Sequence, residues 1–114
     1  MTQNTKSISH YAGDSLILDV TTKTASGERV DLTNADISWV LAKSVSSSPE
    51  LLKDTDSGDI VVTDAENGEF EIKLLPADTE SLSGSYYHEA EVVDSAGNES
   101  TIFVGRFEIK ETAL

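Results

Sequence analysis

The chain has 114 residues and no cysteine, so it has the length of one domain and holds neither a disulfide nor a thiolate metal site. Its formal net charge is −13 at pH 7, from 21 acidic and 8 basic residues, so its surface repels phosphate backbones and we expect no nucleic-acid partner. The polar start lacks the apolar run of a secretory signal and no stretch approaches a membrane span, so we expect a protein made in the cytoplasm that binds no membrane.

The acidity has three interpretations. It can serve solubility at high local concentration, form a charged docking face, or imitate DNA. A DNA mimic needs carboxylates in phosphate-like rows on one face, whereas the acidic residues here are scattered along the whole chain. We therefore expect the charge to serve solubility.

Residues 1–7 are polar and precede the first alternation of apolar and polar residues. We expect them to form a flexible N-terminal arm, followed by a single domain over residues 8–114. Within that domain, period-two alternation predicts short strands that are buried on one face. In chain order these strands are expected at 8–11, 15–23, 29–32, 36–43, 51–53, 60–63 and 69–75, with two more inside 85–110.

A few apolar residues mark the expected core outside the most regular strands. Trp39 lies on the apolar face of its segment, so the one tryptophan is expected to be buried. Leu32 is expected to plug the core from a turn-rich segment. Leu82 is expected to anchor the stretch in which the strand rhythm breaks, with a single helical turn near 78–81. No segment keeps helical spacing over the dozen or so residues that a packed helix needs.

Three four-residue segments of turn-forming residues end in glycine: TASG at 24–27, TDSG at 55–58 and DSAG at 94–97. Glycine at the fourth position, after Asp or Thr at the first, is typical of a type I turn followed by a left-handed residue. We expect the same turn at all three places. The middle one is expected to close a hairpin between 51–53 and 60–63.

The last of these turns lies in the most regular stretch of the sequence, residues 85–110. Its two strands are expected to bury one face that holds Tyr86, His88, Ala90, Val92, Phe103, Gly105, Phe107 and Ile109. The opposite face carries alternating charged residues, as a wetted face requires. About eight short strands with turns every eight to twelve residues predict an all-β sandwich.

The two histidines, His10 and His88, are the first candidates for chemistry. His88 lies on the inward face of its strand, where a histidine is usually a half-buried residue that is hydrogen-bonded to a neighbour. A metal site needs further ligands that converge on it, and no spacing in the sequence places them. We therefore predict no metal site.

The acidic run 54–59 is similar to a calcium-binding loop at first sight. An EF-hand needs glycine at its sixth position and glutamate at its twelfth, whereas Gly58 is fifth here and Ala65 is twelfth. Weak surface calcium binding by Asp54, Asp56 and Asp59 is the alternative to a solvated acidic turn, which we favour.

The inventory for catalysis is poor. The sequence has no cysteine nucleophile, no GxSxG elbow and no glycine-rich phosphate loop after a strand. A sandwich of this size has little room for a substrate cleft between two carboxylates. We therefore expect a protein that is not an enzyme, with no catalytic residue and no cofactor.

The ordered pattern over residues 8–110 resembles small immunoglobulin-like virion proteins of tailed bacteriophages, similar in layout to the N-terminal domain of phage baseplate upper proteins. The matching pieces are Gly13-Asp14 before a strand, Asp31-Leu32-Thr33 before the Trp39 strand, residues 75–79 before Gly84-Ser85-Tyr86, the 94–98 turn, and Gly105 in the final strand. The given sequence stops after one domain, without the helical linker or receptor-binding part of the baseplate proteins, so we expect a stand-alone piece of the particle. The resemblance implies an immunoglobulin-like β-sandwich of about seven to eight antiparallel strands.

The resemblance also implies a structural or accessory protein of the phage particle, located in the virion. Capsid decoration, the neck, and the tail or baseplate are the expected places, and other virion proteins the expected partners. Assembly on a symmetric particle further implies a homo-oligomer or a symmetric array. We expect one sheet edge, or the N-terminal residues 1–10, to dock onto a repeated shell or tail protein, because adding a strand across an open edge makes many main-chain hydrogen bonds.

Two other classes stay open. An immunoglobulin-like module of a bacterial surface protein or adhesin predicts tandem copies and a signal peptide. A small acidic inhibitor or DNA mimic predicts a basic enzyme as partner and absence from purified particles.

Overall fold

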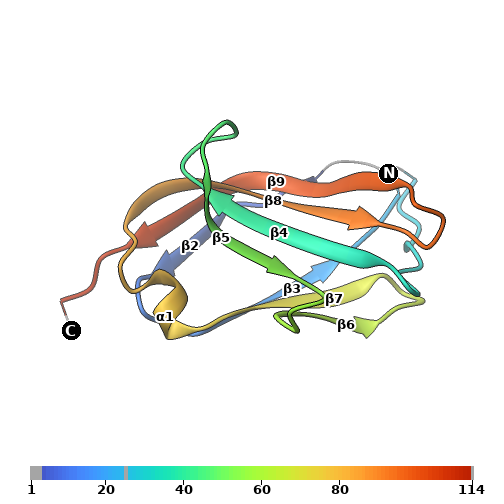
Figure 1. Cartoon of the computed structure of the whole chain (residues 1–114), viewed down its shortest axis with the longest axis horizontal. Helices are drawn as coiled ribbons and strands as arrows, with labels where there is room; N and C mark the ends of the chain where they lie inside the picture. Colours follow the sequence, from blue (N-terminus) through green and yellow to red (C-terminus); the bar gives the residue numbers. More distant parts are fainter. Residues whose placement is uncertain (1–3, 25, 114) are drawn as a thin grey trace.

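The computed structural model describes residues 4–24 and 26–113, which fold into two β-sheets packed face to face. The body is elongated, with extents of 45 × 24 × 23 Å (Figure 1). The strands are β1 (Asn4–Thr5), β2 (Ile8–Tyr11), β3 (Leu16–Thr21), β4 (Asp36–Ala42), β5 (Pro49–Asp54), β6 (Ile60–Asp64), β7 (Glu69–Leu74), β8 (Gly84–Val93) and β9 (Glu99–Lys110), and the helix is α1 (Pro76–Thr79).

The larger sheet has the order β1–β9–β8–β4–β5, with β2 also beside β9, and the smaller sheet has the order β3–β7–β6. Figure 1 shows the two sheets as the two layers of the molecule. In immunoglobulin domains strands B, E and D form one sheet, and strands G, F and C, extended by C′, form the other. The observed order matches this arrangement, with β3, β7 and β6 as B, E and D, and β9, β8, β4 and β5 as G, F, C and C′.

Two side chains strengthen this assignment. The Tyr86 hydroxyl, near the start of β8, donates to the Ser83 carbonyl over 3.1 Å and accepts from the Ser83 amide over 3.3 Å. A tyrosine near the start of strand F that bonds backwards to the main chain is the tyrosine corner of immunoglobulin-like sandwiches. Trp39 on β4 is fully buried between the sheets, as a strand C tryptophan is. The fold is an immunoglobulin-like β-sandwich, as predicted.

One core fills the space between the sheets. The alternating faces that the sequence predicted do point inward, and the predicted Leu32 plug is 1% exposed. The largest fully buried side chains are Trp39, Phe70, Phe103, Phe107, Leu32, Ile37, Leu41, Ile72, Leu74, Ile102, Ile109 and His88. Leu82 packs against this core from its edge.

The predicted hairpin over 85–110 is confirmed as β8 and β9, which pair antiparallel. Its register shifts between Ala90 and Glu91, where β9 carries an extra residue. Such a bulge places two successive residues on the same side of the strand. Ile102 and Phe103 are therefore both buried, whereas simple alternation predicted Phe103 alone.

The three predicted glycine turns are closed by the same hydrogen bond, and residue 25 of the first turn lies outside the described residues. In each, the glycine amide donates to the carbonyl three residues back, in Gly27 to Thr24, Gly58 to Thr55 and Gly97 to Asp94. All three glycines have φ between 86° and 89°. This left-handed conformation strains any residue with a Cβ.

The prediction of a flexible arm over 1–7 is wrong for its second part. Asn4–Thr5 form β1, and the Lys6 amide donates to the Val104 carbonyl over 2.9 Å. Residues 1–3 of the predicted arm lie outside the described residues. Both β1 and β2 pair with β9 in parallel, whereas the seven strands β3 to β9 pair antiparallel among themselves, as predicted. The chain enters alongside its own last strand. β2 is the strand that was expected at 8–11, and β1 is an additional strand within the described residues.

The predicted hairpin between 51–53 and 60–63 is wrong. The TDSG turn forms, yet β5 pairs with β4 in the larger sheet and β6 pairs with β7 in the smaller one. The chain therefore crosses from one sheet to the other at this turn. Lys53 of β5 lies on the inner side of this crossing and is 6% exposed. The predicted hairpin gave no reason to bury this lysine.

Two smaller predictions need adjustment. The helical turn is α1, at 76–79 and not at 78–81, because Pro76 starts it and the Asp78 carboxylate accepts from the Leu75 amide over 2.7 Å. The return strand expected at 29–32 shrinks to one bridge between Lys23 and Arg29.

Candidate functional site

His88 lies at the centre of the larger sheet and is fully buried. The indole nitrogen Nε1 of Trp39 donates to Nδ1 of His88 over 3.1 Å. Because an indole N–H can only donate, Nδ1 must be the unprotonated nitrogen of a neutral ring. Nε2 then carries the proton and donates to the Lys6 carbonyl, 2.7 Å away. The prediction of a hydrogen-bonded histidine is confirmed, and its burial is complete instead of partial.

The surroundings of His88 favour its neutral form. Its ring packs at a tilt against Phe103 at 5.1 Å and edge-on against Phe107 at 5.3 Å, measured between centroids. Burial among these rings lowers the pKa of His88 below 6.5; the bond to the Lys6 carbonyl opposes this, and the Lys6 charge adds to it. A proton on Nδ1 would also face the Trp39 N–H as a second donor.

Gly105, opposite His88, leaves the space in which the N-terminal segment binds. A Cβ at this position would lie 2.0 Å from the Lys6 carbonyl oxygen. No side chain fits such a contact, so glycine is needed here for close approach of two backbones. The Lys6 carbonyl therefore passes directly over β9 and reaches the imidazole beyond it.

His10, the second histidine, has a local role. It is 7% exposed, its Nε2 lies 3.0 Å from the Asp14 carbonyl, and its ring meets Phe107 edge-on at 6.2 Å. The two histidines flank Phe107 and do not face a common point. Among the residues that the structure describes, no group of three or more His, Asp or Glu side chains is arranged to hold a metal ion.

In the acidic run 54–59, Asp54 and Asp59 use their carboxylates internally. Asp54 accepts from the Ser57 amide over 2.7 Å and so caps the turn. Asp59 lies 3.5 Å from the Lys53 ammonium, which also pairs with Asp78 at 2.8 Å. This arrangement favours a solvated turn over a calcium loop. Lys53 joins the two sheets at this flank, since Asp78 belongs to α1, which follows β7.

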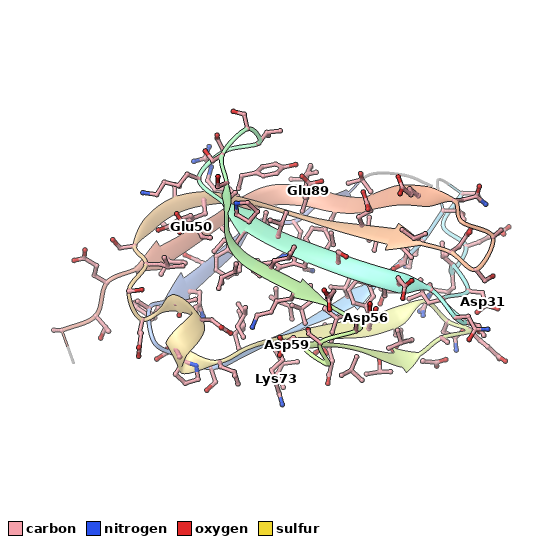
Figure 2. All side chains as sticks on the ribbon, viewed as in Figure 1. Asp31, Glu50, Asp56, Asp59, Lys73 and Glu89 are labelled. Carbon is pink, nitrogen blue, oxygen red and sulfur yellow. The ribbon has the colours of Figure 1, made fainter. Side chains whose placement is uncertain are left out.

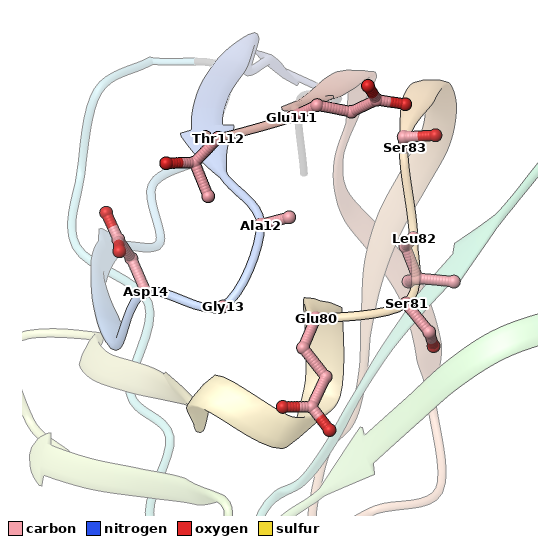
Figure 3. Close-up of a pocket in the computed structure, with 9 residues that line it drawn as sticks. All are labelled: Ala12, Gly13, Asp14, Glu80, Ser81, Leu82, Ser83, Glu111 and Thr112. Carbon is pink, nitrogen blue, oxygen red and sulfur yellow. The ribbon is translucent and has the colours of Figure 1, made fainter. Parts of the chain in front are cut away.

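A hollow of about 580 Å³ lies at the end of the sandwich. Figure 3 shows Asp14, Glu80 and Glu111 around its rim, with their carboxylates apart and directed differently. Its floor is the 12–14 turn, whose Gly13 amide donates to the Thr79 hydroxyl over 3.0 Å. A wide hollow whose acids do not converge offers no acid–base pair.

The outer face of the larger sheet holds a smaller groove of about 250 Å³ beside its open edge. It is lined by Ser38, Trp39, Val40, Leu52, Glu89 and Glu91. Leu52 of β5 is 64% exposed, which is high for a leucine within a strand. Next to it, burial and then the Glu89 charge raise the pKa of Tyr87. Leu52 and its groove form an apolar spot within an acidic face.

Acidic side chains occur both on this face and away from it. Figure 2 shows Glu50 and Glu89 on the larger sheet, Asp56 and Asp59 at the crossing between the sheets, and Asp31 at one end. They form no single row. This distribution agrees with the expectation that the charge serves solubility.

Two features of these sites, the need for Gly105 and the exposure of Leu52, could not be predicted from the sequence. Gly105 is needed because the Lys6 carbonyl, 99 residues earlier in the sequence, lies against it. The exposure of Leu52 depends on which sheet β5 joins. The only local signal was Pro49 at the start of β5, because proline cannot donate to a ladder and marks an edge.

No protein-family model matches the chain, and no curated protein is significantly similar to it. Among the described residues, no helix has the length and apolar character to cross a membrane.

Several solved structures are similar to the chain. One is from the crystal structure of ICOS in complex with ICOS-L and an anti ICOS-L VNAR domain, with 11% identity, a TM-score of 0.45, and 96% of this chain aligned to 56% of that one. Murine CRIg has 14% identity and a TM-score of 0.43 over 93% of this chain and 92% of its own. Tim-1 has 15% identity and a TM-score of 0.46 over 100% and 98%.

The chain thus spans little more than half of the first of these structures. All three TM-scores lie below 0.5. The immunoglobulin-like fold is therefore identified from the strand order and from the tyrosine corner at Tyr86.

Proposed function

We propose that the protein is a non-enzymatic structural or accessory protein of a tailed-phage particle, which holds neighbouring virion proteins through protein–protein contacts. The ordered sequence pattern over residues 8–110 supports the phage assignment. The observation that carries the binding role is the open edge at β5 with exposed Leu52 beside it.

The edge is suited to pairing with another chain. β5 ends the larger sheet, so its outer side faces no further strand among the described residues. The Thr55 amide donates to the Ile37 carbonyl over 3.0 Å, which fixes this position as a hydrogen-bonded pair with β4. In an antiparallel ladder the alternate residues point their backbone groups the other way. Leu52 therefore presents its N–H and C=O groups outward, and Asp54 its N–H, whereas the Asp54 carbonyl already accepts from the Ser57 hydroxyl over 3.0 Å.

An added strand would meet more than backbone groups here. Leu52 is exposed above the groove, and the flanking Glu89 and Glu91 line it. A partner strand would therefore gain apolar contact from Leu52 and main-chain hydrogen bonds from the edge. Pro49 removes one donor at the start of β5, which limits pairing to the part of the strand that follows.

Mass spectrometry of purified particles of the encoding phage tests the assignment directly. The proposal expects this chain among the virion proteins at a fixed copy number. Its absence from clean particles, together with recovery on a basic host protein in a pull-down, would contradict the proposal and favour an acidic inhibitor.

A matched pair of variants tests the surface. Leu52→Asp on β5 should reduce incorporation into particles by about tenfold, because a charge replaces the apolar contact. Val61→Asp on β6, which is 47% exposed on the other sheet, should leave incorporation unchanged. Equal loss in both variants, or in neither, would remove β5 from the proposal.

A further inference from the structure

The N-terminal strand is attached to the body along one side. β1 and β2 pair with β9 in parallel, with Asn4 opposite Phe103 and Tyr11 opposite Lys110. Figure 1 shows this segment running along β9 and then turning into the other layer. The strand therefore lies at an edge of the larger sheet and is the first part of the described chain.

The seat that holds this strand recognises a backbone and not a side chain. His88 donates to the Lys6 carbonyl over 2.7 Å, and Gly105 leaves the space in which that carbonyl sits. The Lys6 amide completes the contact by donating to the Val104 carbonyl. Any extended segment that follows the same path over Gly105 makes the same three interactions.

The turn that connects the strand to the body is short. Residues 12–15 separate β2 from β3, and Gly13 has a φ of 83°. Within this turn, the Asp14 amide donates to the Tyr11 carbonyl over 3.2 Å, and the Asp14 carbonyl lies 3.0 Å from Nε2 of His10. If the turn opened, these bonds would be lost, whereas every bond along β9 could be remade by an identical strand. Exchange of identical elements is a low-cost route to oligomers for this reason.

We propose that the edge of β9 at His88 and Gly105 is a strand-acceptor site, and that a second copy of this chain inserts its N-terminal strand there when copies assemble. The occupant is residues 4–11 of the neighbouring copy. This site is separate from the β5 edge of the proposed function, and its test uses the purified protein and so stands apart from incorporation into particles.

Protonation of His88 opens the site. The groups that pack against this ring are Trp39 on β4, Phe103 and Phe107 on β9, and the Lys6 segment; of these Lys6 is ionisable, and its charge opposes a proton on the ring. Glu89 and Glu91 on β8 project to the opposite face of the sheet and line its outer groove. A second proton would face the Trp39 N–H, so protonation favours a state in which the strand has left. Opening should increase by up to about tenfold per pH unit as the pH falls through the titration of the released histidine.

The chain offers a clean trapping experiment because it has no cysteine. Ser9 lies opposite Glu108, and the Ser9 hydroxyl donates to the Glu108 carboxylate over 3.3 Å. Proteins carrying Ser9→Cys or Glu108→Cys alone are mixed and held at about pH 5 or about pH 7.5, the range in which imidazoles titrate. Both samples are returned to neutral pH and oxidised. We expect a disulfide-linked heterodimer, about tenfold more abundant after the acidic incubation.

Two controls separate exchange from random collision. Ser9→Cys mixed with Lys73→Cys, on the outer face of the other sheet, should give no more than background. His88→Gln, which keeps a donor and an acceptor but does not titrate, should make exchange equal at the two pH values. Light scattering of the wild-type chain after the acidic incubation provides a second readout, with dimers expected.

The proposal is overturned if light scattering finds monomers alone and no heterodimer forms at either pH. It is also overturned if the Lys73→Cys mixture cross-links as strongly as the Glu108→Cys mixture. An unchanged pH response in His88→Gln would remove His88 as the trigger.

Discussion

The indole N–H of Trp39 and Nδ1 of His88 are joined by a buried hydrogen bond of 3.1 Å, at the place where antibody domains carry a disulfide. In those domains the strand C tryptophan packs against a cystine whose second cysteine follows the corner tyrosine by two residues. Here Tyr86 is the corner tyrosine, and the residue two positions later is His88. A hydrogen-bonded pair thus occupies the centre of a sandwich that has no cysteine.

Replacing His88 tests how much this pair contributes to stability. In His88→Leu both the Trp39 N–H and the Lys6 carbonyl lose their buried partner, so we expect a loss of about 2–4 kcal/mol in the free energy of unfolding. His88→Gln keeps a donor and an acceptor and should lose less. Urea unfolding followed by the fluorescence of the one tryptophan measures both variants. Equal losses in the two variants would show that shape, and not hydrogen bonding, decides the site.

The depressed pKa of His88 predicts how stability depends on pH. Burial lowers the pKa of His88 in the folded state below 6.5, its value in the unfolded state. Between the folded and the unfolded pKa, the unfolded state therefore binds more protons than the folded state. Stability from this group is therefore complete above about pH 6.5 and falls as the pH drops through the window below it, by up to about 1.4 kcal/mol per pH unit.

Two other groups act in a separate range. The Thr33 hydroxyl and amide lower the pKa of Asp31, and the Asn98 amide and side chain are the main cause that lowers that of Asp94. Their contributions are present above about pH 3.8 and are lost only as the pH falls further. In the His88→Gln variant, the free energy of unfolding should therefore no longer fall just below pH 6.5, but it should still fall below about pH 3.8 as in the wild type. Unfolding series at several pH values would contradict this if the wild type and the variant had parallel curves.

The sequence predicted the features that depend on local patterns. Alternation identified the buried faces of β7, β8 and β9, and the three glycine turns followed from residue preferences alone. What failed depended on pairing between distant segments. Two short apolar runs on either side of a good turn predict a hairpin, yet the TDSG turn carries the chain between sheets. No local rule distinguishes these outcomes, since the turn is the same in both.

The N-terminal segment shows the same limit. Residues 4–7 are polar, so composition alone predicted a flexible arm. Their order comes from main-chain bonds to β9 and from His88, which lies 82 residues from Lys6 in the sequence. Backbone bonds are independent of side-chain identity, and therefore leave no trace in an apolar pattern.

Gly105→Ala tests the close approach over β9. Its Cβ would meet the Lys6 carbonyl at 2.0 Å, so the strand must shift or leave, at a cost of about 1–3 kcal/mol. The same substitution in a chain that lacks residues 1–7 should cost much less, because the obstructing carbonyl is gone. The comparison is a double-mutant cycle measured by urea unfolding. An equal cost in both backgrounds would place the strain elsewhere.

The ion pair of Lys53 and Asp78 is expected to hold the two sheets together at the β5 flank. The side chains are 7% and 17% exposed, and their charged atoms lie 2.8 Å apart. Asp78→Asn leaves the Lys53 charge with the more distant Asp59 and should cost about 1–3 kcal/mol. Adding Lys53→Met should recover part of that loss, because no buried charge then lacks a partner. Thermal unfolding of the single and double variants measures this, and additive losses would argue against coupling.

Thr22 offers a stabilising change. It is fully buried just after β3, and its hydroxyl oxygen has no hydrogen-bond partner. Its main chain is fully used, since its amide donates to the Gly68 carbonyl and its carbonyl accepts from the Val30 amide. Thr22→Val keeps the shape and both of these bonds and removes the unpaired hydroxyl. The free energy of unfolding should therefore rise by about 1 kcal/mol.

The neighbouring Thr21 is the matched control. It is exposed at the last position of β3, so Thr21→Val should change stability by no more than about 0.5 kcal/mol. Urea unfolding with Trp39 fluorescence measures both variants under one condition. The dependence of the free energy of unfolding on urea concentration should be the same in both. A loss of stability in Thr22→Val would mean that the hydroxyl is bonded in solution, for instance to a buried water, and that the core near Gly68 is wetter than its packing indicates.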